Sequence, residues 1–98
     1  MTDEELTLCC LLWARPGREA ELVDYEDRVL ALLPDHGIEL AVRAIGDGVD
    51  GRPLETQVYR IPEQSALDAY MADPRRTALA DERDRVTART ELFPVTLR

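Results

Sequence analysis

One stretch near the start of the chain decides the fold: Leu6-Thr7-Leu8-Cys9-Cys10-Leu11-Leu12-Trp13. It is apolar at every position except Thr7. A strand with one face in water alternates apolar and polar residues, whereas a strand covered on both faces is apolar nearly throughout. The stretch therefore predicts a central strand, with helices packed on one face and a second covering on the other.

An amphipathic helix is predicted directly after this strand. We expect it to begin at Pro16, because proline suits the first turn of a helix, and to be stopped by Pro34 and Gly37. Tyr25 lies on this helix near the expected sheet surface, and His36 falls in the turn that follows it. One stripe at helical spacing runs along the helix and consists of Leu22, Glu26, Val29 and Leu33.

Two more strands are predicted downstream, one from Ile38 to Ile45 and one from Leu54 to Ile61. The segment between them, residues 46–53, is rich in glycine and predicts a turn, because glycine permits positive φ angles. Side chains alternate along a strand, so those of the strand from Ile38 to Ile45 are divided between two faces. One face consists of Ile38, Leu40, Val42 and Ala44.

The pairing within this hairpin follows from where the turn lies. If the strands close symmetrically about the turn, Arg43 lies opposite Glu55 and Ala41 lies opposite Gln57. Arg43 and Glu55 would then be cross-strand neighbours of opposite charge. The hairpin therefore predicts that Arg43, Glu55 and Gln57 lie close together on the sheet.

A second helical region completes the pattern, with a new start at Asp73 as N-cap and Pro74 as first helical residue. A last strand is predicted from Leu92 to Leu97. The order β-α-β-β-α-β predicts an α+β fold, with one four-stranded antiparallel sheet in the order 4-1-3-2 and helices on one face. The bare face needs a cover, and a small chain gains from docking to a second copy, so we expect a homodimer.

The overall composition limits the classes of partner. The chain has 98 residues, which predicts a single domain over residues 1–98, and its formal net charge is −8. Such a charge disfavours binding to duplex nucleic acid and to anionic membranes. No segment is apolar for long enough to cross a bilayer, and the acidic start Met-Thr-Asp-Glu-Glu is unlike a signal peptide. We therefore expect a cytoplasmic protein that binds neither nucleic acid nor membrane.

The two cysteines predict structure rather than chemistry. Cys9 and Cys10 are neighbours in a strand, so their side chains point to opposite faces and are badly placed to bridge each other. We interpret them as buried thiols in a reducing compartment. No Cys/His cluster has the spacing of a zinc site, and no glycine-rich phosphate loop is present. The sequence thus predicts no metal and no cofactor.

Six residues are candidates for a substrate-binding site. Arg43 with Glu55 could orient a carboxylate or an enol, because a guanidinium offers paired donors; alternatively the two form an ion pair within the sheet or at a dimer interface. Gln57 and Tyr59 could place hydrogen-bond donors in a pocket, or mark an edge of the core with the phenol reaching water. The catalytic residues themselves are not identified by the sequence.

The remaining two candidates come from the first helical segment. His36 could act as a general acid or base, since a histidine titrates near neutral pH, or it could be an ordinary surface residue in a turn. Tyr25 could face a ligand, or it could pack in the core. For every candidate the sequence leaves both interpretations open.

Two stretches carry a resemblance to a known group of proteins. They run from Leu22 to Gly37, followed by a strand containing Val42-Arg43, and from Val58 to Tyr70. Together with the order of elements, they resemble the dimeric α/β-barrel superfamily of ferredoxin-like folds, most closely a small bacterial family of uncharacterised domains. The resemblance implies a homodimer in which two sheets enclose a barrel.

Relatives in that superfamily include antibiotic-biosynthesis monooxygenases, muconolactone isomerases and haem-degrading monooxygenases. The haem-degrading members use an Asn in the first strand and a Trp that closes the third; this chain has no Asn, and Ile61 stands where the Trp would be. The resemblance implies a small-molecule-binding protein, such as a cofactor-independent monooxygenase or isomerase acting on an aromatic or polyketide-like compound. The alternative is a non-catalytic dimerisation or interaction module.

Overall fold

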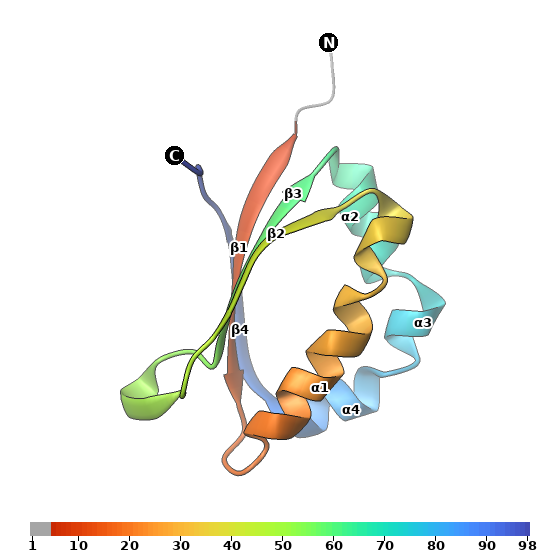
Figure 1. Ribbon diagram of the computed structural model, residues 1–98. Helices are drawn as coiled ribbons and strands as arrows, with labels where there is room; N and C mark the ends of the chain where they lie inside the picture. The colour runs from red at the N-terminus through yellow and green to blue at the C-terminus, as the bar shows by residue number, and fades with distance from the viewer. Residues whose placement is uncertain (1–4) are drawn as a thin grey trace.

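A single sheet backed by helices is formed by residues 5–98, the part of the chain that the computed structural model describes (Figure 1). The first half contains β1 (Leu6–Ala14), α1 (Glu19–Leu30), η1 (Leu33–His36) and β2 (Glu39–Ile45). The second half contains η2 (Val49–Gly51), β3 (Glu55–Ile61), α2 (Gln64–Met71), α3 (Pro74–Thr77), α4 (Ala80–Val86) and β4 (Thr87–Pro94). The predicted order β-α-β-β-α-β is confirmed.

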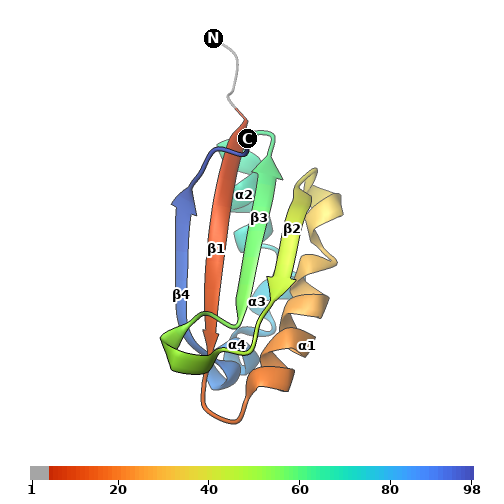
Figure 2. The ribbon, with the colours of Figure 1, turned by 60° about the vertical axis from the view of Figure 1, so that its left-hand side comes forward.

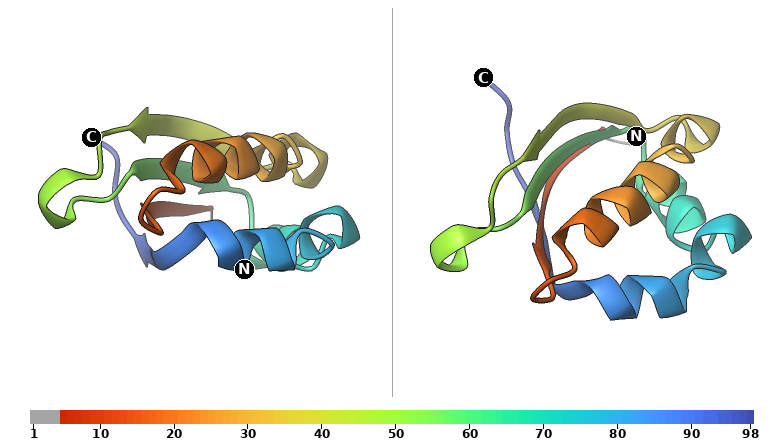
Figure 3. Two further views of the ribbon diagram at one scale, coloured as in Figure 1. Left: turned by 90° about the horizontal axis from the view of Figure 1, so that it is seen from below. Right: turned by 60° about the horizontal axis from the view of Figure 1, so that its bottom comes forward.

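The four strands lie in the order β2-β3-β1-β4, and every neighbouring pair is antiparallel. This is the predicted order 4-1-3-2 read from the other edge, with β1 in the interior of the sheet. Figure 2 shows the strands side by side in front of the helices, and the two views of Figure 3 show the helices on one side of a curved sheet. The sheet therefore has one covered face and one bare face, as the order of elements predicts.

The core lies between the sheet and α1. The predicted stripe of this helix is confirmed, because Leu22, Val29 and Leu33 are almost fully buried. Glu26 is buried with them, although a carboxylate is rarely buried without a partner. The helix thus carries one acidic group into the interior beside its apolar residues.

The predicted start of the first helix is wrong by three residues. The helix begins at Glu19 rather than Pro16, because Gly17 has a φ of 81°, which lies outside the helical region. A turn precedes it, in which the Arg18 amide donates to the Arg15 carbonyl at 2.9 Å. At the far end, His36 is part of the short 3-10 helix η1 and not of an irregular turn.

The predicted pairing of β2 with β3 is also wrong. Arg43 lies opposite Gln57 and Ile45 lies opposite Glu55, a shift of two positions. The hairpin closes where the Gly46 amide donates to the Leu54 carbonyl at 2.7 Å. The turn is therefore centred at a different point from the one that symmetrical closure predicts. Because side chains alternate with a period of two, a shift of two positions does not by itself move a residue to the other face.

A bulge in β2 changes the predicted faces of that strand. Leu40 lies opposite Tyr59, Val42 lies opposite Val58, and Ala41 between them is the extra residue. An extra residue in one strand reverses the alternation beyond it. Leu40 therefore packs toward the core while Val42 lies on the bare face, instead of both sharing one face as predicted.

The last strand begins earlier than predicted. It covers Thr87–Pro94 rather than 92–97 and follows α4 directly. Its first half is polar and lies at the edge of the sheet, so the sequence lacks the apolar alternation of a strand there. The predicted helix start at Asp73 is confirmed, since its carboxylate accepts from the Arg75 amide at 2.9 Å. Over residues 5–98, no helix combines the length and the apolarity needed to span a bilayer.

Candidate functional site

A chain of polar side chains crosses the covered face of the sheet beneath α1. Arg43 donates from Nε and Nη2 to the two oxygens of Glu55, at 2.8 and 2.9 Å. The same guanidinium donates to the Val23 carbonyl at 3.2 Å and pairs with Asp27. Glu55 is fully buried, and a buried charge needs a partner inside the protein, which Arg43 supplies. The paired donors of Arg43 are thus used within the chain.

Gln57 extends this chain toward α1. Its side-chain nitrogen donates to Glu55 Oε1 and to Glu26 Oε1, both at 2.9 Å. Its oxygen accepts a hydrogen bond from the Tyr59 hydroxyl. Both donors and the acceptor of the amide are therefore used. The result is a continuous network from Arg43 to Glu26 and Tyr59.

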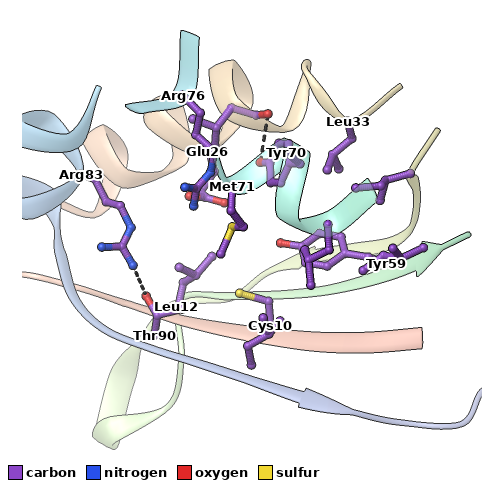
Figure 4. Close-up of a pocket in the computed structure, with 15 residues that line it drawn as sticks. Cys10, Leu12, Glu26, Leu33, Tyr59, Tyr70, Met71, Arg76, Arg83 and Thr90 are labelled. Carbon is purple, nitrogen blue, oxygen red and sulfur yellow. Dashed lines mark hydrogen bonds between the residues drawn. The ribbon is translucent and has the colours of Figure 1, made fainter. Parts of the chain in front are cut away.

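Glu26 and Tyr59 face a cavity of about 70 Å³ between the sheet and the helices. One buried water needs only ~10–15 Å³, and packed cores have few larger voids. Figure 4 shows Cys10 and Tyr59 reaching into the cavity from the sheet, opposite the helical residues Glu26, Tyr70 and Arg76. The apolar part of its wall consists of Leu12, Val29, Leu33, Ile38, Ile61, Leu67, Met71 and Leu92.

A second hollow lies next to this cavity, on the helical side of the molecule. It is an open depression of about 340 Å³, and Tyr25 lines it together with Thr77 and Ala80. Three residues line both spaces: Met71, Arg76 and Arg83. These three side chains therefore form the boundary between the inner cavity and the outer depression.

Burial sets the protonation of the groups on the cavity wall. It raises the pKa of the Glu26 carboxyl above its ordinary value, an effect that the Gln57 hydrogen bond opposes. A carboxylate with a raised pKa is a better proton acceptor near neutral pH. Burial also raises the pKa of the Tyr59 hydroxyl, which keeps its proton and can only act as a neutral donor.

Cys10 is not an activated nucleophile. Burial raises the pKa of its thiol to about 11, so very little thiolate is present at neutral pH. Cys9 and Cys10 are both free, and their side chains point to opposite faces of the sheet, as predicted. In residues 5–98 no group of three or more histidine, cysteine or acidic side chains is arranged to hold a metal ion.

His36 lies outside the cavity and binds another part of the protein. Its Nε2 is 2.8 Å from Asp73 Oδ2, and its ring meets Tyr70 edge-on at 5.9 Å between centroids. Hydrogen bonds from Arg75 and from His36 lower the pKa of the Asp73 carboxyl. This contact ties η1 to the junction of α2 and α3.

The structure thus separates the six predicted site residues. Tyr59 lines the cavity, and Tyr25 lines the outer depression with a buried hydroxyl that has no hydrogen-bond partner among the described residues. Gln57, Glu55 and Arg43 lie behind Tyr59 and support it through hydrogen bonds. His36 lies apart from both spaces. A role in ligand binding stays a prediction for all six.

Several residues at the cavity were not predicted as site residues. Glu26 had a recognisable signal, since it is an acidic residue on an otherwise apolar helical stripe. Arg83 had a similar signal, since it lies in line with Leu79 and Val86 at helical spacing. Arg76 had none. Tyr70 has the spacing of a core residue, and it is one: its hydroxyl donates to the Val29 carbonyl at 3.1 Å.

No family model matches this sequence, and no curated protein is significantly similar to it. Solved structures do match. A dimeric protein of unknown function with a ferredoxin-like fold from Bacteroides fragilis superposes with a TM-score of 0.71 at 11% identity, covering 99% of this chain and 100% of that one. The fold is ferredoxin-like.

Two further solved structures share this ferredoxin-like fold. A candidate antibiotic biosynthesis monooxygenase from Bacteroides thetaiotaomicron matches with a TM-score of 0.76 at 14% identity, over 96% of this chain and 90% of that one. A NIPSNAP family protein of unknown function from Agrobacterium tumefaciens matches with a TM-score of 0.75 at 12% identity, over 97% and 92%. At such identities the likeness establishes the architecture alone.

Proposed function

We propose that this protein binds a small aromatic or polyketide-like molecule in the cavity between sheet and helices, and acts on it as a cofactor-independent monooxygenase. One observation carries the proposal: a buried carboxyl, Glu26, faces a cavity between the sheet and the helices. The likeness to a candidate antibiotic biosynthesis monooxygenase supports the same class of reaction.

The chemistry needs a base and an electron-rich substrate. Glu26 would remove a proton from a carbon next to a carbonyl or phenol. The Tyr59 hydroxyl donates to Gln57 Oε1 and would thereby hold the Gln57 amide, which donates to Glu26. The resulting carbanion can reduce O₂ itself. For anthrone, the methylene carbon becomes a carbonyl: one oxygen atom enters the product, and the other leaves as water with the two methylene hydrogens. An isomerase would use the same base to remove a proton and return it elsewhere.

Oxidation of anthrone tests this proposal. We expect the wild-type protein to accelerate both O₂ uptake and anthraquinone absorbance over the buffer rate. Glu26→Gln should lower that acceleration by roughly 10²–10⁴-fold, the usual contribution of a general base. Glu21→Gln is the matched control, because Glu21 lies on the same helix, is exposed and pairs with Arg18.

The outcomes separate the two enzymatic hypotheses. Equal rates for the wild type and Glu26→Gln would contradict the role of Glu26. Exchange of the methylene hydrogens for deuterium without O₂ uptake would favour an isomerase over a monooxygenase.

The proposal includes a homodimer formed through the bare face of the sheet. An apolar row crosses all four strands there: Val42 lies opposite Val58, Val58 opposite Cys9, and Cys9 opposite Phe93. Val42 and Phe93 are 42% and 38% exposed at the two edges. Covering a large apolar side chain contributes ~1.5–3 kcal/mol, against an association cost of roughly 4–15 kcal/mol. Cys9 and Val58 are already only 8% exposed, so the gain from association comes mainly from Val42 and Phe93 of both copies.

The alternative, a non-catalytic dimerisation module, is favoured by one observation. The polar residues Arg43, Glu55 and Gln57 are all used in hydrogen bonds within the protein, as that hypothesis expects. The cavity beside Glu26 and Tyr59 favours the ligand-binding protein instead, because a purely structural core would be packed there.

A further inference from the structure

Arg76 is a half-buried arginine whose guanidinium is incompletely paired. Its Nε is buried and has no hydrogen-bond partner, and no carboxylate lies within ion-pair distance of its guanidinium, among residues 5–98. Its guanidinium carbon lies 5.2 Å from the centroid of the Tyr70 ring, and the Glu26 carboxyl lies close enough to interact with its charge, though beyond ion-pair distance. A buried polar atom left unpaired destabilises a protein. An anionic ligand would supply the missing partner.

Arg83 is a second guanidinium on the same boundary. Its Nη2 donates to Thr90 Oγ1 at 3.4 Å, near the limit of a hydrogen bond, and its Nη1 is 4.0 Å from Asp84. Figure 4 shows Arg76 and Arg83 extending from the helices toward the cavity. Both residues line the cavity and the outer depression. Two guanidiniums with weakly used donors therefore border both spaces.

The negative charge of the rest of the protein limits where an anion can bind. The chain carries 20 acidic and 12 basic residues, so its overall field repels anions. An anion is accepted only where local cations outweigh that field. The inner wall holds the Glu26 carboxyl, which disfavours a second negative charge deeper in the cavity. A bound anion would thus keep its charge at the boundary and its apolar part inside.

The size of the site requires the two spaces to join. Ligand pockets measure about 300–1,000 Å³, and the inner cavity of about 70 Å³ is much smaller. Met71 separates it from the depression of about 340 Å³ and is 43% exposed. A methionine side chain is unbranched and adaptable. A change of its rotamer would open the cavity to the depression, with the two arginines beside the passage.

We propose that Arg76 and Arg83 bind the carboxylate of an aromatic carboxylic acid, whose ring system passes Met71 and enters the cavity below. A guanidinium pairs with a carboxylate through two parallel hydrogen bonds. The inference rests on the proposed function, because it names the class of ligand for the same cavity. The same two arginines, and not Arg43, then recognise the acid group.

Two fluorescent probes of nearly equal size test the inference: 9-anthracenecarboxylate and the neutral 9-anthracenemethanol. Fluorescence anisotropy gives the affinity of each probe for the wild type and the variants. We expect Arg76→Gln to weaken binding of the carboxylate by roughly tenfold to a hundredfold, as for a lost hydrogen bond to a charged group. Binding of the alcohol should stay within twofold, Arg83→Gln should act in the same direction, and Arg76→Lys should restore part of the affinity.

Arg85→Gln is the matched control, because Arg85 is exposed on α4 and lines neither space. It should leave both affinities unchanged. The inference is overturned if the wild type binds the carboxylate no more tightly than the alcohol, or if Arg76→Gln weakens both probes equally. The proposed function survives either result as long as the alcohol binds in the cavity.

Cys10→Leu separates a failure of the inference from a failure of the proposed function. The larger side chain fills the inner cavity, so both probes should bind more weakly to this variant. If the wild type binds neither probe, or if Cys10→Leu binds both as tightly as the wild type, the cavity is not the ligand site. The proposed function then fails, and the inference fails with it. Circular dichroism shows whether each variant is folded.

Discussion

Glu26 connects the stability of the protein to its proposed chemistry. Its carboxyl is buried beneath α1 and accepts a hydrogen bond from the Gln57 amide. Burial raises its pKa, so the folded state holds a proton that the unfolded chain would release at lower pH. The raised pKa that suits Glu26 to accept a proton from a ligand therefore also makes the stability of the protein depend on pH.

The sign of that dependence follows from linkage. Between the pKa of Glu26 in the unfolded chain and its raised pKa in the folded state, the folded state binds more protons, so its contribution to stability falls as pH rises. We expect the free energy of unfolding of the wild type, relative to Glu26→Gln, to decrease over this range by at most about 1.4 kcal/mol per pH unit. Urea unfolding at several pH values and one fixed protein concentration measures it. A difference independent of pH would show that the carboxyl is not perturbed.

At the scale of residues, the sequence predicts some contacts for reasons that are only partly correct. Arg43 and Glu55 do form an ion pair, although they are not directly opposite each other as the predicted pairing requires. An arginine side chain is long enough to reach a diagonal neighbour on the next strand. Arg76 could not be predicted, because its incomplete pairing depends on the placement of every acidic residue around it.

At the scale of elements, continuous apolarity correctly predicts that β1 lies inside the sheet. The bulge at Ala41 has no signal in the sequence, since alanine is compatible with either face. The start of β4 was missed because Arg89, Thr90 and Glu91 lie at a sheet edge, where polar residues are tolerated. Backbone hydrogen bonds to β1, and not an apolar pattern, define that strand.

The bare face of the sheet leads to a prediction about assembly. We expect the wild type to have twice the mass of the chain in size-exclusion chromatography with light scattering at micromolar concentration. Val42→Glu should shift it to the monomer, because a charge would be buried against an apolar partner. Val49→Glu is the control: Val49 is similarly exposed, at 47%, but lies in the hairpin turn outside the sheet. A monomeric wild type would contradict the proposed dimer.

At the scale of the whole molecule, the sheet serves two purposes on its two faces. The bare face offers an apolar surface to a second copy, and the covered face holds a cavity with a carboxyl on its wall. The element order predicts both faces. It cannot predict the cavity, which exists because side chains from β1, β3, β4, the four α-helices and η1 leave a space unfilled between them.

The central claim is that the cavity between the sheet and the helices is the ligand site, and nuclear Overhauser effects test it most directly. With 9-anthracenecarboxylate as the probe, we predict effects between its ring protons and the methyl groups of Leu12, Met71 and Leu92, which line the cavity. Effects confined to the methyl groups of Val42 and Val58 would place the probe on the bare face and contradict the claim.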